Sequence, residues 1–192
     1  NTAISGMTTQ VPFLSIGALN AMSEQQIASI NPTYFAQITP GTITLLDQES
    51  IQGLTPAQIA ALDIGQLDVL SVPQMGWLSA NQINNIDTAD INTLDPDQIG
   101  GITSAYLQDV NKNIFLALSG YSNPGTPDYG QIGGITPGQS PYIPDVAIQG
   151  FSAAQIQGLK PASLNAMYDY QIQAIDVGLV DDLLDSQIQG LT

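Results

Sequence analysis

The sequence predicts an all-α solenoid of short, N-capped helices, with one helix in each eight-residue repeat. Two columns of apolar residues, three positions apart, recur at intervals of eight through most of the 192-residue chain. Residues that favour helix N-caps follow the second column throughout the first part of the chain. Because apolar residues three apart share one face of a helical turn, whereas a half-buried strand needs a spacing of two, the pattern favours helices.

The regular part of the array extends over residues 11–119. Its first apolar column runs from Val11 to Phe115 and its second from Leu14 to Leu118, and neither column contains a polar residue. The next residue is always Ser, Thr, Asn or Asp, and proline often follows it, as at the first position of a helix. Glutamine commonly stands three residues after the cap, which completes a capping box. We therefore expect a helix of about six or seven residues in each octad.

Such helices require their neighbours. Isolated helices shorter than ~12–15 residues are marginal in water, so stability must come from stacking of successive repeats. Each cap contributes ~1 kcal/mol, and each buried Ile or Leu contributes ~1.5–3 kcal/mol. Stabilisation by contacts between adjacent repeats is the physical basis of a solenoid.

The register breaks once. Residues 120–147 are rich in Gly and Pro and are expected to form an insertion loop, which keeps one degenerate octad at Ile132 and Ile135. The repeat then resumes over residues 148–192 as a second segment with looser caps. Residues 1–10 lie outside the register and are expected to form an extended N-terminal arm.

Composition narrows the function classes. The chain has two basic and 17 acidic residues, no His and no Cys, and a net charge of −15. It therefore lacks nucleophile systems based on His or Cys, thiolate and imidazole metal sites, and disulfides, and no carboxylate pair stands apart from the caps as a glycosidase pair. We expect no enzyme, no nucleic-acid partner, because the charge repels phosphate, and no membrane insertion. Because the chain begins with Asn1, we expect a processed form or a piece of something larger.

Most acidic residues fall at or beside cap positions, where they also interact favourably with the helix dipole. The residues interpreted as caps are Asp47, Asp63, Asp87, Asp95 and Asp176. The alternative is that clustered carboxylates supply oxygen ligands for Ca²⁺, although none matches an EF-hand loop. No other cofactor is expected. The candidate Ca²⁺ ligands are Asp87, Asp90, Asp95, Asp97, Asp181, Asp182 and Asp185.

Aromatic residues in the insertion allow two interpretations. Tyr121, Tyr129 and Tyr142 could stack on sugars or anchor a protein interface. They could equally fold back and cover the edge of the core beneath the loop. Both interpretations remain open at this point.

Several octads resemble the tandem L-[ST]-x-x-Q-[IV]-x-x-L repeats of very large secreted bacterial surface proteins, adhesins and related repetitive proteins. They are LTPAQIAAL at 54–62, LSANQINNI at 78–86, LDPDQIGGI at 94–102 and FSAAQIQGL at 151–159. The resemblance covers most of the chain outside 1–10 and 120–147. It implies an extracellular structural or adhesive role and supplies no catalytic residues. The octads here vary more than those of long adhesin arrays, which favours a subunit with particular contacts over a spacer.

These observations predict a structural repeat protein, a subunit or segment of an extracellular bacterial filament or adhesin. The first octad, with Val11 and Leu14, and the last, with Ile188 and Leu191, are as apolar as the interior. We expect these ends to stack head to tail on further copies of the chain into an open filament, because solenoid ends without polar caps leave the core open. The alternative is a monomeric binding module that holds a carbohydrate or protein ligand through the insertion loop and the solenoid surface. The further interface candidates are Tyr121, Tyr129 and Tyr142.

Overall fold

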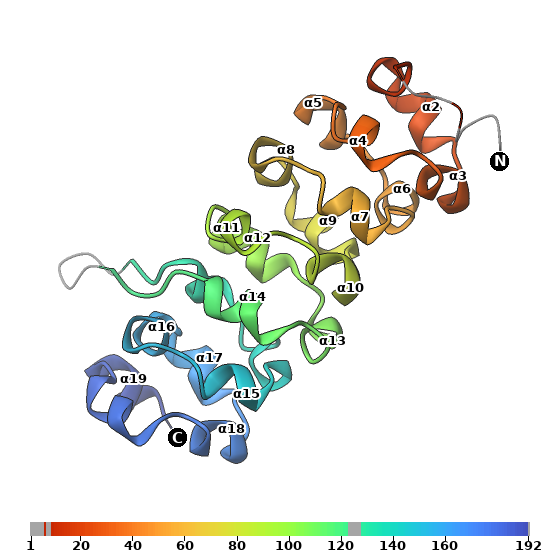
Figure 1. The fold of residues 1–192 in the computed structure, drawn as a ribbon. Coiled ribbons are helices and arrows are strands. Elements are labelled where there is room, and N and C mark those ends of the chain that lie inside the picture. The colour runs from red at the N-terminus through yellow and green to blue at the C-terminus, as the bar shows by residue number, and fades with distance from the viewer. Residues whose placement is uncertain (1–5, 7–8, 123–127, 192) are drawn as a thin grey trace.

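The computed structural model describes residue 6, residues 9–122 and residues 128–191, and within these ranges the chain forms helices and no strand. The helices stack into an elongated superhelical rod with α2 near one end and α19 near the other (Figure 1). The predicted all-α solenoid is confirmed. The α-helices are α2 Ile16–Asn20, α3 Glu24–Ala28, α4 Pro32–Phe35, α5 Pro40–Ile43, α6 Gln48–Gln52, α7 Pro56–Ile59, α8 Ile64–Asp68, α9 Val72–Trp77, α10 Ala80–Ile83, α11 Thr88–Ile91, α12 Pro96–Gly101, α13 Ser104–Leu107, α14 Lys112–Ala117, α15 Asp145–Ile148, α16 Ala153–Gly158, α17 Pro161–Asn165, α18 Asp169–Gln173 and α19 Asp185–Gly190. The 3-10 helices are η1 Val11–Phe13, η2 Gln131–Gly134, η3 Ser140–Tyr142 and η4 Val177–Asp182.

Most of the α-helices are shorter than the six or seven residues expected, and only α9, α12, α14, α16 and α19 among those described reach six. The α-helices have four to six residues; α10 has four and α9 has six. The reason is the backbone between helices: Leu78 and Ser79, which separate α9 from α10, are both extended, with ψ of 132° and 160°. Where the second apolar residue and the cap residue of an octad are both extended, at most six positions are left for the helix.

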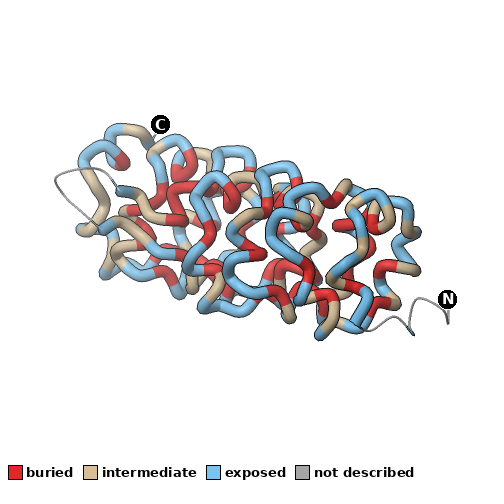
Figure 2. Tube along the Cα trace, turned by 90° about the horizontal axis from the view of Figure 1, so that it is seen from above, coloured by how far each residue is buried: buried red, intermediate tan, exposed pale blue. Residues whose placement is uncertain are grey.

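Both apolar columns line the inside of the rod and form one continuous core. Side chains of the first column are at most 4% exposed from Val11 to Leu164, and those of the second are buried from Ile30 to Ile175. Figure 2 shows the buried residues along the interior, with exposed residues on the outer bends. Each short helix is therefore held by its neighbours, as the solenoid prediction requires.

Glycines allow some turns to pack backbone against backbone. A Cβ added at Gly101 of α12 would lie 2.6 Å from the carbonyl oxygen of Val72 in α9. A Cβ at Gly134 of η2 would collide with the backbone of Pro96 in α12. The contact between α9, α12 and η2 therefore depends on small residues between the two apolar columns.

The structure narrows the insertion expected at 120–147. Ile132 and Ile135 occupy the two columns, and the next octad places Ser140 and Ile143 there, all four buried. Ser140 concealed this octad in the sequence, because its first-column residue is polar. Helices η2, η3 and α15 thus belong to the array, and the interruption is a nine-residue excess before Ile132.

The extra residues enter inside a capping box without breaking it. The Ser119 N–H donates to Gln131 Oε1 at 2.9 Å, and Ser119 Oγ accepts the Gln131 N–H at 3.1 Å. Uninterrupted octads make the same two bonds between residues three apart. Gly130 closes the loop with φ of 61°, where a Cβ would collide with the carbonyl oxygens of Ser119 and Gly120. Residues 123–127 of the loop lie outside the described residues.

The predicted N-terminal arm, residues 1–10, falls mostly outside the described residues. Only Gly6, Thr9 and Gln10 are described, and each lies in a turn. Helix η1 follows directly.

Candidate functional site

A column of buried glutamines joins successive turns of the solenoid. Gln82 stands at the third position of α10, and its Oε1 accepts the Ser79 N–H at 2.8 Å. Its Nε2 donates to the carbonyls of Ile51 at 2.9 Å and Leu54 at 2.8 Å, one superhelical turn earlier. We call the residues that make both kinds of bond the glutamine ladder. They are Gln58, Gln66, Gln74, Gln82, Gln98, Gln131, Gln139, Gln155, Gln171 and Gln187.

The ladder sets the size of a turn. In uninterrupted regions the Nε2 donors lie 28 and 30 or 31 residues after their acceptors. Other bonds between turns span similar lengths: Thr103 Oγ1 donates to the Gly76 carbonyl, 27 residues earlier. A span of 28 residues is three and a half octads. Each glutamine therefore reaches a point between two octads of the turn before it.

The chemistry of this position favours glutamine over glutamate. A glutamate could accept the cap N–H, as capping boxes allow. It would then place a second, buried oxygen against two carbonyl oxygens, with no donor between them. Glutamine supplies one acceptor and two donors, and in the part of the chain that the structure describes no buried side-chain nitrogen or oxygen lacks a partner.

Sequence reasoning found only half of this arrangement. The capping-box pattern accounted for Oε1 and left Nε2 without a role. The usable signal was that no octad carries Glu at the third helical position, although capping boxes accept it equally. Two serines replace the glutamine as donors: Ser163 Oγ donates to the Ile135 carbonyl at 2.7 Å, and Ser50 Oγ donates to Asn20 Oδ1 at 3.0 Å.

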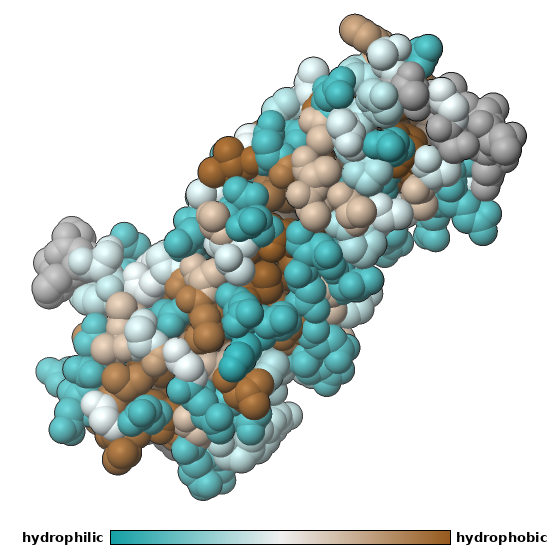
Figure 3. Space-filling view, viewed as in Figure 1, coloured by the Kyte–Doolittle hydropathy of each residue, from teal (hydrophilic) through white to brown (hydrophobic). Residues whose placement is uncertain are grey.

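The two ends of the rod differ in burial, which corrects one expectation. The first column is covered by the following turn, so Val11 is 0% exposed and is not an open interface residue. Leu14 is half-buried. In the last turn the first column becomes uncovered after Leu164, with Val180 47% and Ile188 54% exposed. Leu191 is also exposed, and hydrophobic surface is visible at this end of the rod (Figure 3).

Gln187 is the last ladder glutamine among the described residues. Gln187 reaches back to the carbonyls of Ile156 and Leu159. Within the described residues no ladder glutamine follows, so none donates to the carbonyls of Leu164 and later column residues. The last turn, residues 164–191, thus offers uncovered apolar side chains together with a row of carbonyls that interior turns use for a glutamine.

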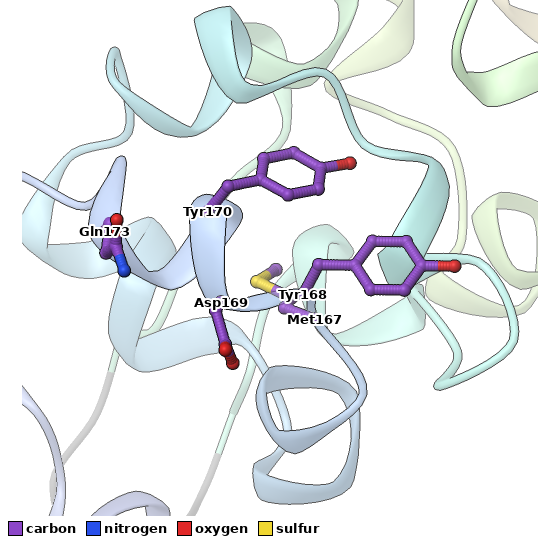
Figure 4. A pocket seen from close by; sticks show the side chains of 5 residues that line it. All are labelled: Met167, Tyr168, Asp169, Tyr170 and Gln173. Atoms are coloured by element: carbon purple, nitrogen blue, oxygen red, sulfur yellow. The ribbon is translucent and has the colours of Figure 1, made fainter.

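The tyrosines of the predicted interface separate into two places. Tyr121 and Tyr129 meet edge to face at the base of the insertion, with ring centroids 6.2 Å apart, and both are half-buried. Tyr142 is exposed and lines a depression with Tyr170 of α18. Sequence reasoning missed Tyr168 and Tyr170, which stack at 5.6 Å with ring planes 19° apart and point the same way (Figure 4).

Most of the acidic residues interpreted as caps do cap helices. Side chains of Asp47, Asp63, Asp87 and Asp176 each accept a backbone N–H in the first turn. Asp95 occupies the cap position of α12 without a side-chain cap bond, and its own N–H donates to Gln98. The cap interpretation therefore holds in full for four of these five.

The candidate Ca²⁺ ligands are not gathered into a site. Among the described residues no group of three or more acidic side chains could hold a metal ion. Ca²⁺ binding stays a prediction that the geometry does not support. The residues concerned are Asp87, Asp90, Asp95, Asp97, Asp181, Asp182 and Asp185.

One carboxylate outside these clusters is perturbed. The Gly130 N–H and the Ser122 hydroxyl both donate to Asp128, each at 3.0 Å. These bonds, the backbone one foremost, hold the pKa of Asp128 below its ordinary value. Asp128 therefore fixes the base of the insertion in its ionised form.

Comparison with models of known protein families finds no match, and comparison with curated protein sequences finds none either. Of the helices described, none has the length and apolar character that crossing a membrane would require.

Proposed function

We propose that the chain is a structural, non-enzymatic repeat protein that stacks end to end, as a subunit or segment of an extracellular bacterial filament or adhesin. The observation that carries this proposal is the last turn. Val180, Ile188 and Leu191 are exposed there, whereas the equivalent residues of interior turns are buried by the next turn. A further turn of octads, supplied by a second copy, would cover them in the same way.

The opposite end of the rod offers a matching donor. Gln26 stands at the third position of α3, and its Oε1 accepts the Ser23 N–H at 2.9 Å, as in the ladder. No residue of these 192 lies 28 positions before it to receive its Nε2. Stacked on the last turn of another copy, Gln26 would meet carbonyls of the kind that every ladder glutamine binds. The joint would then repeat the bonding inside each rod.

Charge and burial set the strength of the joint. Burying each exposed Ile, Leu or Val contributes up to ~1.5–3 kcal/mol, and each hydrogen bond adds ~1 kcal/mol. Ordering two rods costs several kcal/mol, and rods of charge −15 repel each other. We therefore expect weak association that strengthens with protein concentration and with ionic strength.

Three features support the extracellular part of the proposal. The octads resemble those of secreted surface proteins. The two lysines, Lys112 and Lys160, offer few sites to trypsin-like proteases. The acidic surface keeps an apolar repeat soluble before assembly. A monomeric module that binds its ligand through the insertion stays the alternative.

The test is assembly of the purified chain in a concentration series at low and high salt, followed by light scattering and negative-stain electron microscopy. We expect filaments or short linear oligomers that grow with salt. The variant Ile188→Glu should abolish them. Its matched control is Ile64→Glu, because Ile64 is 48% exposed on the side of the rod, away from either end.

Two results would overturn the proposal. One is a monodisperse monomer at every concentration and salt. The other is equal loss of assembly in both variants, which would show that the added charge, and not the last turn, controls association. Circular dichroism melting of both variants verifies that they remain folded.

A further inference from the structure

The start of α18 breaks the capping rule of the repeat. Tyr168 occupies the cap position that Ser, Thr, Asn or Asp holds throughout residues 11–119, and α18 keeps only the Gln171 half of the box, from Oε1 to the Tyr168 N–H at 2.8 Å. Losing a cap side chain weakens the start of a helix. Pro144, Lys160 and Leu184 hold the same position in α15, α17 and α19, so what distinguishes Tyr168 is its exposed aromatic ring and not the lost cap.

Three tyrosine rings are exposed together here. Tyr168 and Tyr170 are 55% and 56% exposed, and they stack on each other with both rings directed away from the helix (Figure 4). Tyr142 of η3 lines a depression of about 170 Å³ with Tyr170, Asp145 and Gln108. We call these five residues the tyrosine surface. Four elements or turns contribute to it, so it is formed only when successive turns stack.

We propose that the tyrosine surface binds a lysine- or arginine-rich segment of a partner protein. Faces of tyrosine rings attract cations, and two exposed rings, Tyr142 and Tyr170, line the same depression as Asp145, while Tyr168 stacks on Tyr170. Because Tyr168 and Tyr170 stack on each other, a cation would lie on the outer faces of the pair. The aliphatic part of a lysine or arginine side chain would lie along the rings, and its charged end would reach Asp145.

The charge of the whole chain selects the same partner. A net charge of −15 attracts basic ligands over several ångströms and repels phosphate-bearing and other anionic ones. The tyrosine surface contains neither of the two lysines. Asp169, although next to both rings in sequence, points away from them, so Asp145 is the carboxylate that the proposal uses (Figure 4).

The test is binding of fluorescein-labelled octalysine to the full chain, measured by fluorescence anisotropy at a concentration where light scattering shows only monomer. This condition separates the outcome from that of the assembly experiment. The double variant Tyr168→Ala, Tyr170→Ala should weaken binding by about three- to tenfold. Asp145→Asn should weaken it at least about twofold more than Asp97→Asn, an equal change of charge at another exposed first-turn position.

The controls make the proposal falsifiable. Equal effects of Asp145→Asn and Asp97→Asn, with no effect of the tyrosine variant, would reduce the binding to overall charge and overturn the proposal. Binding of a neutral oligosaccharide such as maltohexaose, lost in the tyrosine variant while octalysine does not bind, would overturn it in favour of a sugar site. Melting curves confirm that each variant keeps the fold.

Discussion

The middle turns, residues 55–102, and the last turn, residues 164–191, are made from the same octad, yet they differ in what covers them. In the middle, four consecutive octads carry a ladder glutamine, and both apolar columns are buried. In the last turn Leu179 stands between the ladder residues Gln171 and Gln187, and the first column becomes exposed toward Ile188. The octad therefore does not determine burial alone. An octad is fully buried only when the next turn packs against it, so the contacts between turns stabilise the fold.

The sharpest test of this contrast is Gln82→Glu in the middle turns. A buried carboxylate facing the carbonyls of Ile51 and Leu54 should lower the free energy of unfolding by about 3–5 kcal/mol at pH 7. Burial raises the pKa of the new carboxyl in the folded state, so its protonated form can donate to a carbonyl. The loss should therefore shrink as pH falls toward the unfolded pKa of about 4.3 and grow as pH rises through the folded pKa.

Urea unfolding of the variant at pH 4 and pH 7 measures this dependence. The matched control is Gln26→Glu, because Gln26 is half-buried and its cap bond survives the change. A pH-independent loss, or an equal loss at Gln26, would mean that the bonds between turns contribute little.

A smaller difference in stability between the middle turns and the last turn is expected when one buried or one exposed isoleucine is shortened to alanine. Ile83→Ala empties a fully buried first-column position and should cost about 2–4 kcal/mol. Ile188→Ala changes the same residue type where it is 54% exposed and should cost less than about 1 kcal/mol. Thermal or urea unfolding of both variants gives the comparison. Similar costs would contradict the view that the last turn is uncovered.

The smallest effect concerns the insertion. Deleting residues 120–128 joins Ser119 to Tyr129 and restores the sequence spacing of an ordinary octad, with Gln131 three positions after its cap. Because the capping box already exists in the folded chain, stability should stay within about 1 kcal/mol or rise slightly through the shorter loop. Unfolding of the deletion variant measures this. Loss of cooperative unfolding would show that the insertion contributes to the core.

The sequence is sufficient to predict the array of octads, but it does not predict the number of octads in each superhelical turn. Columns such as Ile83 and Ile86 follow from spacing along the chain, and cap bonds such as that of Asp87 are local, so both could be predicted. The number of octads per turn depends on bonds between residues 28 apart, which periodicity along the chain does not reveal. The octad at Ser140 was missed because its hydroxyl bonds to Thr136 and lets a polar residue occupy the core.

The candidate surfaces divide in the same way. Exposure of Ile188 and Leu191 was predictable from their place in the last octad. The prediction that Val11 is open was wrong. Each turn covers the apolar column of the turn before it, and this direction of covering depends on the superhelix and not on the octad sequence. Tyr168 stands at the cap of α18 and Tyr170 at its second position, and nothing local indicates that Tyr142 lies beside Tyr170.

The half-octad offset between turns affects how the rod responds to pulling and shear. Because a turn has about 28 residues, the extended residues between two octads of one turn lie over the middle of an octad in the next turn. The extended residues between octads are therefore not aligned along the rod. A force on one such connection is shared by two octads of the adjacent turn. The same offset means that a surface position recurs in line only every second turn, which is every seven octads.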